Sequence, residues 1–153
     1  MKKQPCICDL IADIFQKKIE TAEELRRIIG IEGVKKAESN SHSKREPRPC
    51  GLTIHPGFGC PNNCVYCYVP TISGLKEPEP SELNGLELAY ALVSNPYFLP
   101  GRMGTFIAMG AVCDPLHPKL VEKTLDYINC IQEFLGNPIQ LSTKMHVNLN
   151  LAK

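Results

Sequence analysis

The chain has 153 residues and a formal net charge of +1, with 43% hydrophobic and 22% charged residues. This length suits one domain, and the composition is typical of a globular protein that buries a core. The near-zero net charge excludes a chain-wide positive field that would attract nucleic acid or an anionic membrane. No apolar run approaches the ~18 residues of a membrane span, and no long apolar segment follows the charged N-terminus, so we expect a cytoplasmic protein without a membrane partner.

Apolar residues recur at helical spacing from residue 6 to residue 29, which predicts a helix with one apolar face. Thr21 followed by Glu24 matches a capping box, so we expect a second helix to begin at Thr21. Glycine is the residue that most often ends a helix, so we expect a helix to end at Gly30. We interpret residues 1–38 as a helical appendage to the main domain.

A polar segment, residues 39–49, follows this appendage and contains two prolines. Such a composition predicts a linker. His42 lies within it without an evident partner, and we expect its side chain to be exposed. Residues 50–153 are expected to form the main domain.

Three segments of the main domain have the composition of β-strands. The first is residues 52–54 and the last is residues 139–144. Between them, residues 104–112 form a nearly continuous apolar run, as expected of a strand that is buried on both faces of a parallel sheet.

Two helices are expected between these strands. Ser81 is the expected N-cap of the first, which ends at Asn95 before a proline. The second has apolar residues at helical spacing over residues 120–135 and ends at Gly136. Strands that alternate with helices predict an α/β fold with a parallel sheet, here about three βα units. In such folds ligands bind at the carboxyl ends of the strands.

Three of the eight cysteines, Cys60, Cys64 and Cys67, follow the first strand in the spacing C-x3-C-x2-C. Clustered thiolates select zinc, Cu(I) or iron–sulfur clusters. Their clustering fits metal ligation in a reducing cytosol better than a disulfide framework. Most iron–sulfur clusters and structural zinc sites use four protein ligands. Three cysteines can therefore hold a four-iron cluster with one iron open to a reactant. The other five cysteines are expected to be ordinary buried or partly buried thiols: Cys6, Cys8, Cys50, Cys113 and Cys130.

The C-x3-C-x2-C loop after a first strand, with the aromatic residue Tyr66 just before its last cysteine, resembles the radical S-adenosylmethionine (radical SAM) superfamily. The resemblance implies that Cys60, Cys64 and Cys67 bind a [4Fe-4S] cluster. It also implies that Tyr66 is one of the cofactor-binding residues. It implies that S-adenosylmethionine (SAM) chelates the fourth iron and is cleaved reductively to a 5′-deoxyadenosyl radical. An electron donor such as ferredoxin or flavodoxin is then an implied partner. No catalytic residue is assigned.

Two further strand ends carry polar residues that this resemblance places near SAM. Ser142 and Lys144 belong to a Ser-Thr-Lys run that resembles the spore photoproduct lyase-like branch, where such residues contact SAM, and Lys144 would pair with its carboxylate. Asp114 follows the second strand, and two roles are open for it. It could accept a hydrogen bond from the ammonium or a ribose hydroxyl of SAM, or it could begin an Asp-Pro turn. The branch implies a lyase that acts on a DNA lesion. The sequence lacks the aromatic and basic groove of single-strand binders, which gives little support for nucleic acid as a partner.

The resemblance spans residues 50–144 and covers the first half of a partial (βα) barrel of the radical SAM type. Residues 145–153 alternate apolar and polar side chains, as in a strand, and do not begin the next helix. An open parallel sheet that ends on an apolar strand is prone to aggregate. We therefore expect a truncated or split gene product, or a subunit that a second chain completes, with doubtful activity alone.

A different class of protein remains open. The same loop could belong to a non-catalytic iron–sulfur or zinc-binding module with no SAM site. In that case Cys50 or Cys113 would supply the fourth ligand. Metal content and the response to SAM distinguish the two hypotheses.

Overall fold

The computed structural model describes residues 7–73 and 77–147 and contains a three-stranded parallel sheet. Its strands are β1 (Leu52–Ile54), β4 (Ile107–Met109) and β5 (Ile139–Leu141), in the order β1-β4-β5. The pairing is in register, so that Leu52 is opposite Ile107 and Ile107 opposite Ile139. The predicted α/β class with a parallel sheet is confirmed. The described residues contribute these three strands to it and do not close a barrel.

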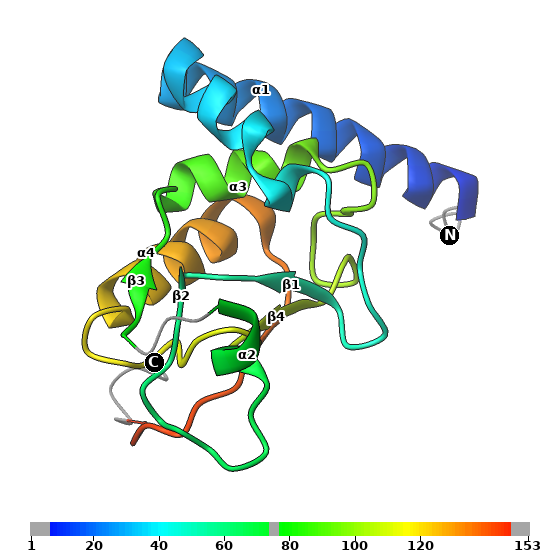
Figure 1. Ribbon diagram of the computed structural model, residues 1–153. Coiled ribbons are helices and arrows are strands. Elements are labelled where there is room, and N and C mark those ends of the chain that lie inside the picture. Colours follow the sequence, from blue (N-terminus) through cyan, green and yellow to red (C-terminus); the bar gives the residue numbers. More distant parts are fainter. Residues whose placement is uncertain (1–6, 74–76, 148–153) are drawn as a thin grey trace.

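Helices connect the parallel strands. The helix α3 (Gly85–Ser94) lies between β1 and β4 in the chain, and α4 (Val121–Cys130) lies between β4 and β5 and continues into a π-helical turn, η2 (Ile131–Leu135). Figure 1 shows β1 below α3. Gly136, in the left-handed conformation with φ 66°, ends the second helix as predicted.

Short elements follow β1 before α3 begins. They are a two-residue antiparallel pairing and one helical turn: β2 (Gly57–Phe58), β3 (Glu79–Pro80) and α2 (Val69–Ser73). In Figure 1, α2 lies below β1, on the side away from α3. The cysteine loop therefore extends away from the helical layer.

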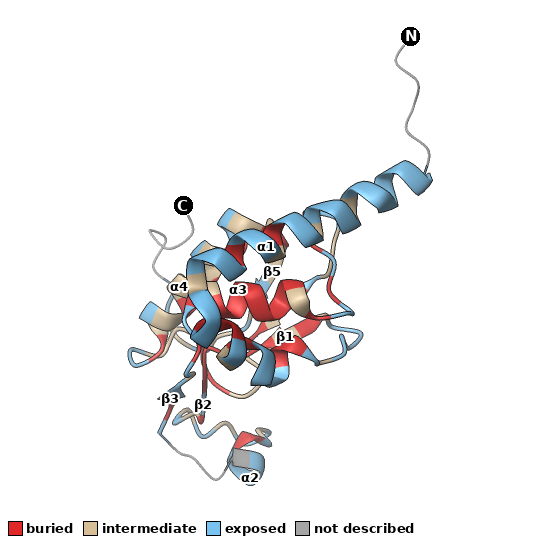
Figure 2. Cartoon of the chain, turned by 90° about the horizontal axis from the view of Figure 1, so that it is seen from above, coloured by how far each residue is buried: buried red, intermediate tan, exposed pale blue. Residues whose placement is uncertain are grey.

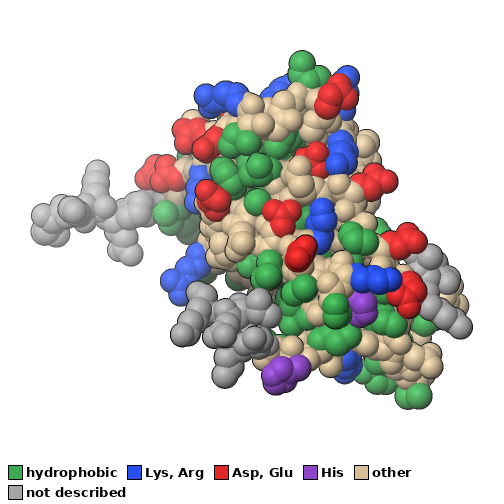
Figure 3. All heavy atoms as spheres, turned by 90° about the vertical axis from the view of Figure 1, so that its left-hand side faces the viewer, with side chains coloured by type: hydrophobic (Ala, Val, Ile, Leu, Met, Phe, Trp, Pro, Cys, Tyr) green, Lys and Arg blue, Asp and Glu red, His purple; other side chains and the backbone are tan. Residues whose placement is uncertain are grey.

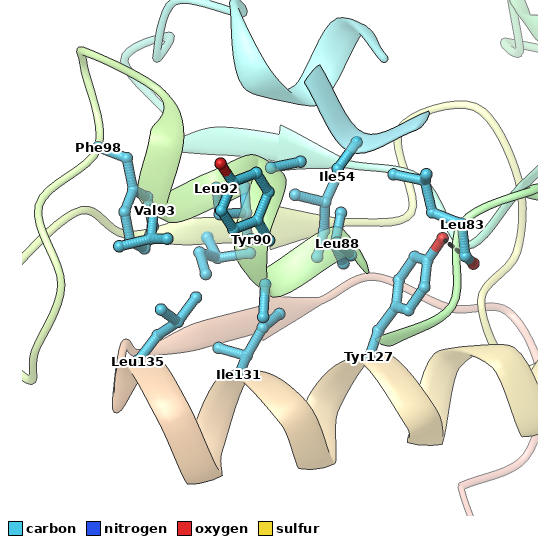
Figure 4. Close-up of a cluster of buried hydrophobic side chains, with 14 of the residues drawn as sticks. Ile54, Leu83, Leu88, Tyr90, Leu92, Val93, Phe98, Tyr127, Ile131 and Leu135 are labelled. Carbon is cyan, nitrogen blue, oxygen red and sulfur yellow. Dashed lines mark hydrogen bonds between the residues drawn. The ribbon is translucent and has the colours of Figure 1, made fainter. Parts of the chain in front are cut away.

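The core lies between the sheet and its crossover helices. Figure 4 shows Tyr127, Ile131 and Leu135 pointing from α4 and η2 toward side chains of α3 and β1, such as Leu88 and Ile54. All five of these side chains are fully buried. The Tyr127 hydroxyl donates a hydrogen bond of 3.1 Å to the Leu83 carbonyl, which satisfies its polar atom inside the apolar cluster.

The start of α3 differs from the prediction. Ser81 is not its N-cap, because the helix begins after Asn84. The Asn84 side chain accepts from the Glu87 backbone N–H, and the Glu87 carboxylate accepts from the Asn84 backbone N–H, which makes a full capping box. One carboxylate and one amide thus satisfy two free N–H groups. A single serine at position 81 could satisfy only one, so it stabilises a helix start less.

The N-terminal helix α1 (Ile7–Ser39) passes through Thr21 without a break, so the predicted second start at Thr21 is wrong. It is interrupted at Gly30, where φ is 67° and ψ is −177°, and then resumes. Leu25 and Ala37 are fully buried, and α1 packs on α3. Figure 2 shows the first half of α1 exposed and extending from the rest of the chain. No helix in the described ranges is long and apolar enough to cross a membrane.

Within the described part of the chain, helices cover one face of the sheet, and the opposite face is partly exposed. Ile107 and Met109 are buried under the helices, whereas Ala108 between them is partly exposed and Phe106 is 41% exposed. The prediction that this strand is buried on both faces is therefore wrong. Thr53, Ala108 and Gln140 form one row across the uncovered face. Parallel sheets are normally covered on both faces, so this row is unusual.

His42 is buried, with 2% of its surface exposed, and the prediction that it is exposed is wrong. It belongs to a short turn, η1 (Ser41–Ser43), that packs on α3. The Asn95 side chain, at the end of α3, donates 2.8 Å hydrogen bonds to the carbonyls of His42 and Arg45. The His42 ring accepts through Nε2 from the His55 backbone N–H at 3.1 Å. These contacts bind the polar segment to the main domain.

Acid is expected to destabilise the fold through this histidine pair. Burial, with the nearby Arg45 charge, lowers the pKa of His42 to about 3 and that of His55 to about 4. The unfolded chain binds these protons near pH 6.5, so stability present at neutral pH is lost as the pH falls below 6.5. We expect the free energy of unfolding, measured with urea, to fall by about 2 kcal/mol per histidine between pH 7.5 and pH 5.

The His42→Gln variant should show about half of this pH dependence. The control is His146→Gln, because His146 is exposed. An acid response in His42→Gln as steep as in the His146→Gln control would contradict the assignment.

Candidate functional site

A cavity of about 540 Å³ opens at the carboxyl ends of the three parallel strands. Its walls come from the loop after β1, the turn after β4 and the residues after β5. All seven residues that the sequence singled out for metal or cofactor binding line it: Cys60, Cys64, Tyr66, Cys67, Asp114, Ser142 and Lys144. We call this hollow the cysteine cavity. The volume suits a ligand of the size of a small cofactor.

The cysteine loop bends at two residues with positive φ. Gly59 has φ 90° and Asn63 has φ 43°, and these are the residue types that tolerate such angles best. The Cys67 backbone N–H then donates to the Cys64 carbonyl at 2.9 Å, which closes a turn around the last two cysteines. All three cysteines are free thiols with partial exposure. The three cysteines therefore line the cavity and are partly open to solvent.

Three cysteines in one cavity wall are a donor set for an iron–sulfur cluster or for a single soft metal ion. In the part of the chain that is described, no three His, Cys, Asp or Glu side chains converge on one point where a metal ion would sit. A zinc ion requires every sulfur at about 2.3 Å from one centre. An iron–sulfur cluster binds each cysteine through a different iron, so its thiolates are spread around the cluster. The metal content of the reconstituted chain distinguishes these two types of site.

Asp114 connects the three strand ends. The residue is 4% exposed, and its carboxylate accepts from the Asn62 side chain at 3.0 Å and from the Leu116 backbone N–H at 3.1 Å. It also accepts from the Thr143 hydroxyl at 2.6 Å and from the Lys144 backbone N–H at 2.7 Å. A carboxylate offers about four acceptor sites. The protein itself uses them, which favours the turn interpretation of Asp114 over a direct contact with SAM.

Lys144 and Tyr66 meet across the mouth of the cavity. The Lys144 ammonium lies 5.5 Å from the centre of the Tyr66 ring, within the range of a cation–π contact. The Tyr66 hydroxyl raises the pKa of Lys144 by hydrogen bonding. Lys144 is exposed and stays charged at neutral pH. The pair thus places a cation beside the cysteine loop, where a carboxylate could dock.

Sequence reasoning missed the roles of other residues in the cavity wall. Asn62 and Thr143 hold Asp114, and the Tyr68 hydroxyl donates to the Ala111 carbonyl at 3.1 Å. Both Asn62 and Thr143 lie inside segments that the sequence singled out, so their position was visible. Their partner was not, because it lies 52 residues from Asn62 and 29 residues from Thr143.

The remaining cysteines differ in their surroundings. Cys113 is buried, as predicted, and lines the cysteine cavity; burial raises its pKa to about 12, so it is a thiol. Cys130 is partly buried, as predicted, whereas the prediction is wrong for Cys8 and Cys50, which are exposed. Cys50 lies before β1 and lines other hollows, so it is poorly placed as a fourth metal ligand. Cys6 lies outside the described residues.

Comparisons with protein-family models, with curated proteins and with solved structures find no match for this chain. The function proposed for it therefore depends on its residues and their geometry.

The alternation of apolar and polar residues over 145–153 is the pattern of a strand after β5. Residues 145–147 form no strand, and residues 148–153 lie outside the described part of the chain.

Proposed function

We propose that this chain is a radical SAM iron–sulfur protein with the first half of a (βα) barrel. The observation that supports it is the cysteine cavity, where residues from three separate segments of the sequence lie around one hollow at the strand ends. Cys60, Cys64 and Cys67 would hold a [4Fe-4S] cluster as thiolates. When bound, the cluster supplies the electron for cleavage of the sulfonium of SAM.

The chain's own residues would bind and orient SAM. The exposed ammonium of Lys144 would pair with its carboxylate, held near the cysteine loop by Tyr66. Ser142 would offer its hydroxyl from the neighbouring wall. Asp114 would act as a positioning residue, because its hydrogen bonds hold the cysteine loop and the residues after β5 at a constant distance.

Partners follow from the same proposal. An electron donor such as ferredoxin or flavodoxin would reduce the cluster through the exposed cysteine loop. A second chain would supply the remaining βα units, because the uncovered row Thr53, Ala108 and Gln140 lacks the layer that parallel sheets normally have. A lyase reaction on a DNA lesion is proposed from the Ser142–Lys144 resemblance alone. Figure 3 shows acidic and basic side chains intermingled on one face, without a basic surface there for a nucleic acid.

Anaerobic reconstitution tests this function. The full chain, treated with iron and sulfide, is expected to bind about four irons. The electron paramagnetic resonance spectrum of its reduced form should change on addition of SAM. Serine variants of Cys60, Cys64 or Cys67 should each lose the cluster. Cys50→Ser is the matched control, since Cys50 is exposed and lies outside the cavity.

Three results would contradict the proposal. One is about one zinc per chain and no iron after reconstitution. Another is a cluster whose spectrum is indifferent to SAM, which would indicate the non-catalytic module. The third is loss of the cluster in Cys50→Ser, which would assign that cysteine as a ligand.

A further inference from the structure

A second hollow lies beside β1 on the uncovered face of the sheet. Its volume is about 680 Å³, and we call it the arginine pocket after two of its lining residues. Its lining includes Arg45, Arg48, Thr53, His55, Tyr68 and Ala111. Thr53 alternates along β1 with Leu52 and Ile54, which are buried toward the helices. The pocket is therefore on the opposite side of the sheet from the core.

The arginine pocket and the cysteine cavity share a wall. Tyr68 and Ala111 line both hollows. The hydrogen bond from the Tyr68 hydroxyl to the Ala111 carbonyl, 3.1 Å long, lies in this wall. A ligand in one hollow would thus lie next to a ligand in the other.

The pocket carries two guanidinium groups, and within residues 7–73 and 77–147 neither forms an ion pair with a carboxylate. Burial, and next the charge of Arg48, lowers the pKa of Arg45, so the two arginines repel one another. The ion pairs of the described residues all use lysines, not these arginines. Glu46 also lines the pocket, and its carboxylate accepts a hydrogen bond from the Tyr97 hydroxyl. An anion between the arginines would relieve their repulsion.

Arg45 is held in place before any ligand arrives. Its Nη1 donates to the Thr53 carbonyl at 2.9 Å and to the Thr53 hydroxyl at 3.1 Å, and lies 2.6 Å from Nε2 of the His55 ring. Its Nη2 donates to the Ser41 hydroxyl at 2.9 Å. A guanidinium has five N–H donors, so some remain for a ligand. The exposed Arg48 side chain can close on the same ligand.

We propose that the arginine pocket binds a phosphate or carboxylate group of the substrate. Guanidinium groups favour these two anions because their paired donors match two oxygen atoms. The shared wall would place the neighbouring part of that substrate next to the cysteine cavity. This second statement rests on the function proposed above, whereas anion binding by the pocket does not.

Titration of the full chain with inorganic phosphate, and separately with succinate, tests the inference at low ionic strength. Chemical shifts of the arginine side-chain N–H groups report binding. We expect saturable binding of at least one anion, weakened about tenfold or more by Arg48→Gln, because a charge-assisted hydrogen bond is lost. Which anion binds more tightly distinguishes a phosphorylated substrate from a carboxylic acid. Arg102→Gln is the matched control, since Arg102 is exposed and lies outside the pocket.

The inference is overturned if neither anion binds saturably, or if Arg48→Gln and Arg102→Gln weaken binding equally. It is also overturned if a single-stranded oligonucleotide binds through Arg48 while both free anions fail, because that result would assign a nucleic-acid surface instead. Cluster content of Arg48→Gln is measured in parallel. A chain that binds phosphate through Arg48 but assembles no cluster would support the pocket and count against the proposed function alone.

Discussion

Replacing Asp114 with alanine is expected to lower the free energy of unfolding by about 3 kcal/mol. The reason is that four donors from three segments would lose one buried acceptor at once. Each donor left without a partner costs free energy unless water reaches it, and the cysteine cavity admits water to some of them. Urea unfolding monitored by circular dichroism measures the loss.

Two companion variants sharpen this test. Asp114→Asn keeps the shape of the side chain but presents an amide N–H₂ to groups that also donate, so its loss should be a substantial part of the alanine loss. Glu122→Ala, at an exposed position of α4, should change stability by no more than about 0.5 kcal/mol. If Asp114→Ala were as mild as Glu122→Ala, the role of Asp114 in joining the strand ends would be refuted.

A methyl group at Gly110 is expected to be the more disruptive of two matched glycine substitutions. Gly110 lies just after β4 with φ 106°, and a Cβ there would lie 2.3 Å from the Ser142 carbonyl oxygen. Gly101 has a similar φ of 103°, but a Cβ there would meet no atom within 4 Å. Gly101→Ala therefore measures backbone strain alone, about 1–3 kcal/mol. Gly110→Ala should cost about 2 kcal/mol more, because β4 and the segment after β5 must separate.

Urea unfolding of both variants gives the difference directly. Gly110 also lines the cysteine cavity, so the separation should weaken the response of the reconstituted cluster to SAM in Gly110→Ala and not in Gly101→Ala. Equal losses of stability in the two variants would show that the close approach of Gly110 to Ser142 does not exist in solution.

The accuracy of the sequence-based predictions depended on the range of the interactions involved. The end of α4 at Gly136 was predicted correctly because a left-handed glycine is a local requirement. The start of α3 was placed at Ser81 although the capping pair Asn84 and Glu87 was present in the sequence. Two side chains that cap one another stabilise a helix start more than a single serine does, and both lie close together in the sequence.

The buried state of His42 could not be predicted in this way. Its neighbours in the chain are polar, and the acceptor carbonyls of His42 and Arg45 meet the Asn95 side chain about 50 residues away. Burial of a polar segment depends on whether such a distant donor arrives. The same reason explains Asp114, whose two interpretations were equal until its partners in the cysteine loop and after β5 were known.

The amino-acid sequence alone determined the alternation of strands and helices and the spacing of Cys60, Cys64 and Cys67, because periodicity and loop chemistry are properties of neighbouring residues. It also determined that polar residues follow each strand. Only the tertiary structure decided that these residues surround one cavity, that Asp114 is used by the protein itself, and that one face of the sheet lies uncovered beside two arginines. Those outcomes depend on contacts between residues far apart in the chain. Such contacts form only when the whole domain packs, so they cannot be read from neighbouring residues.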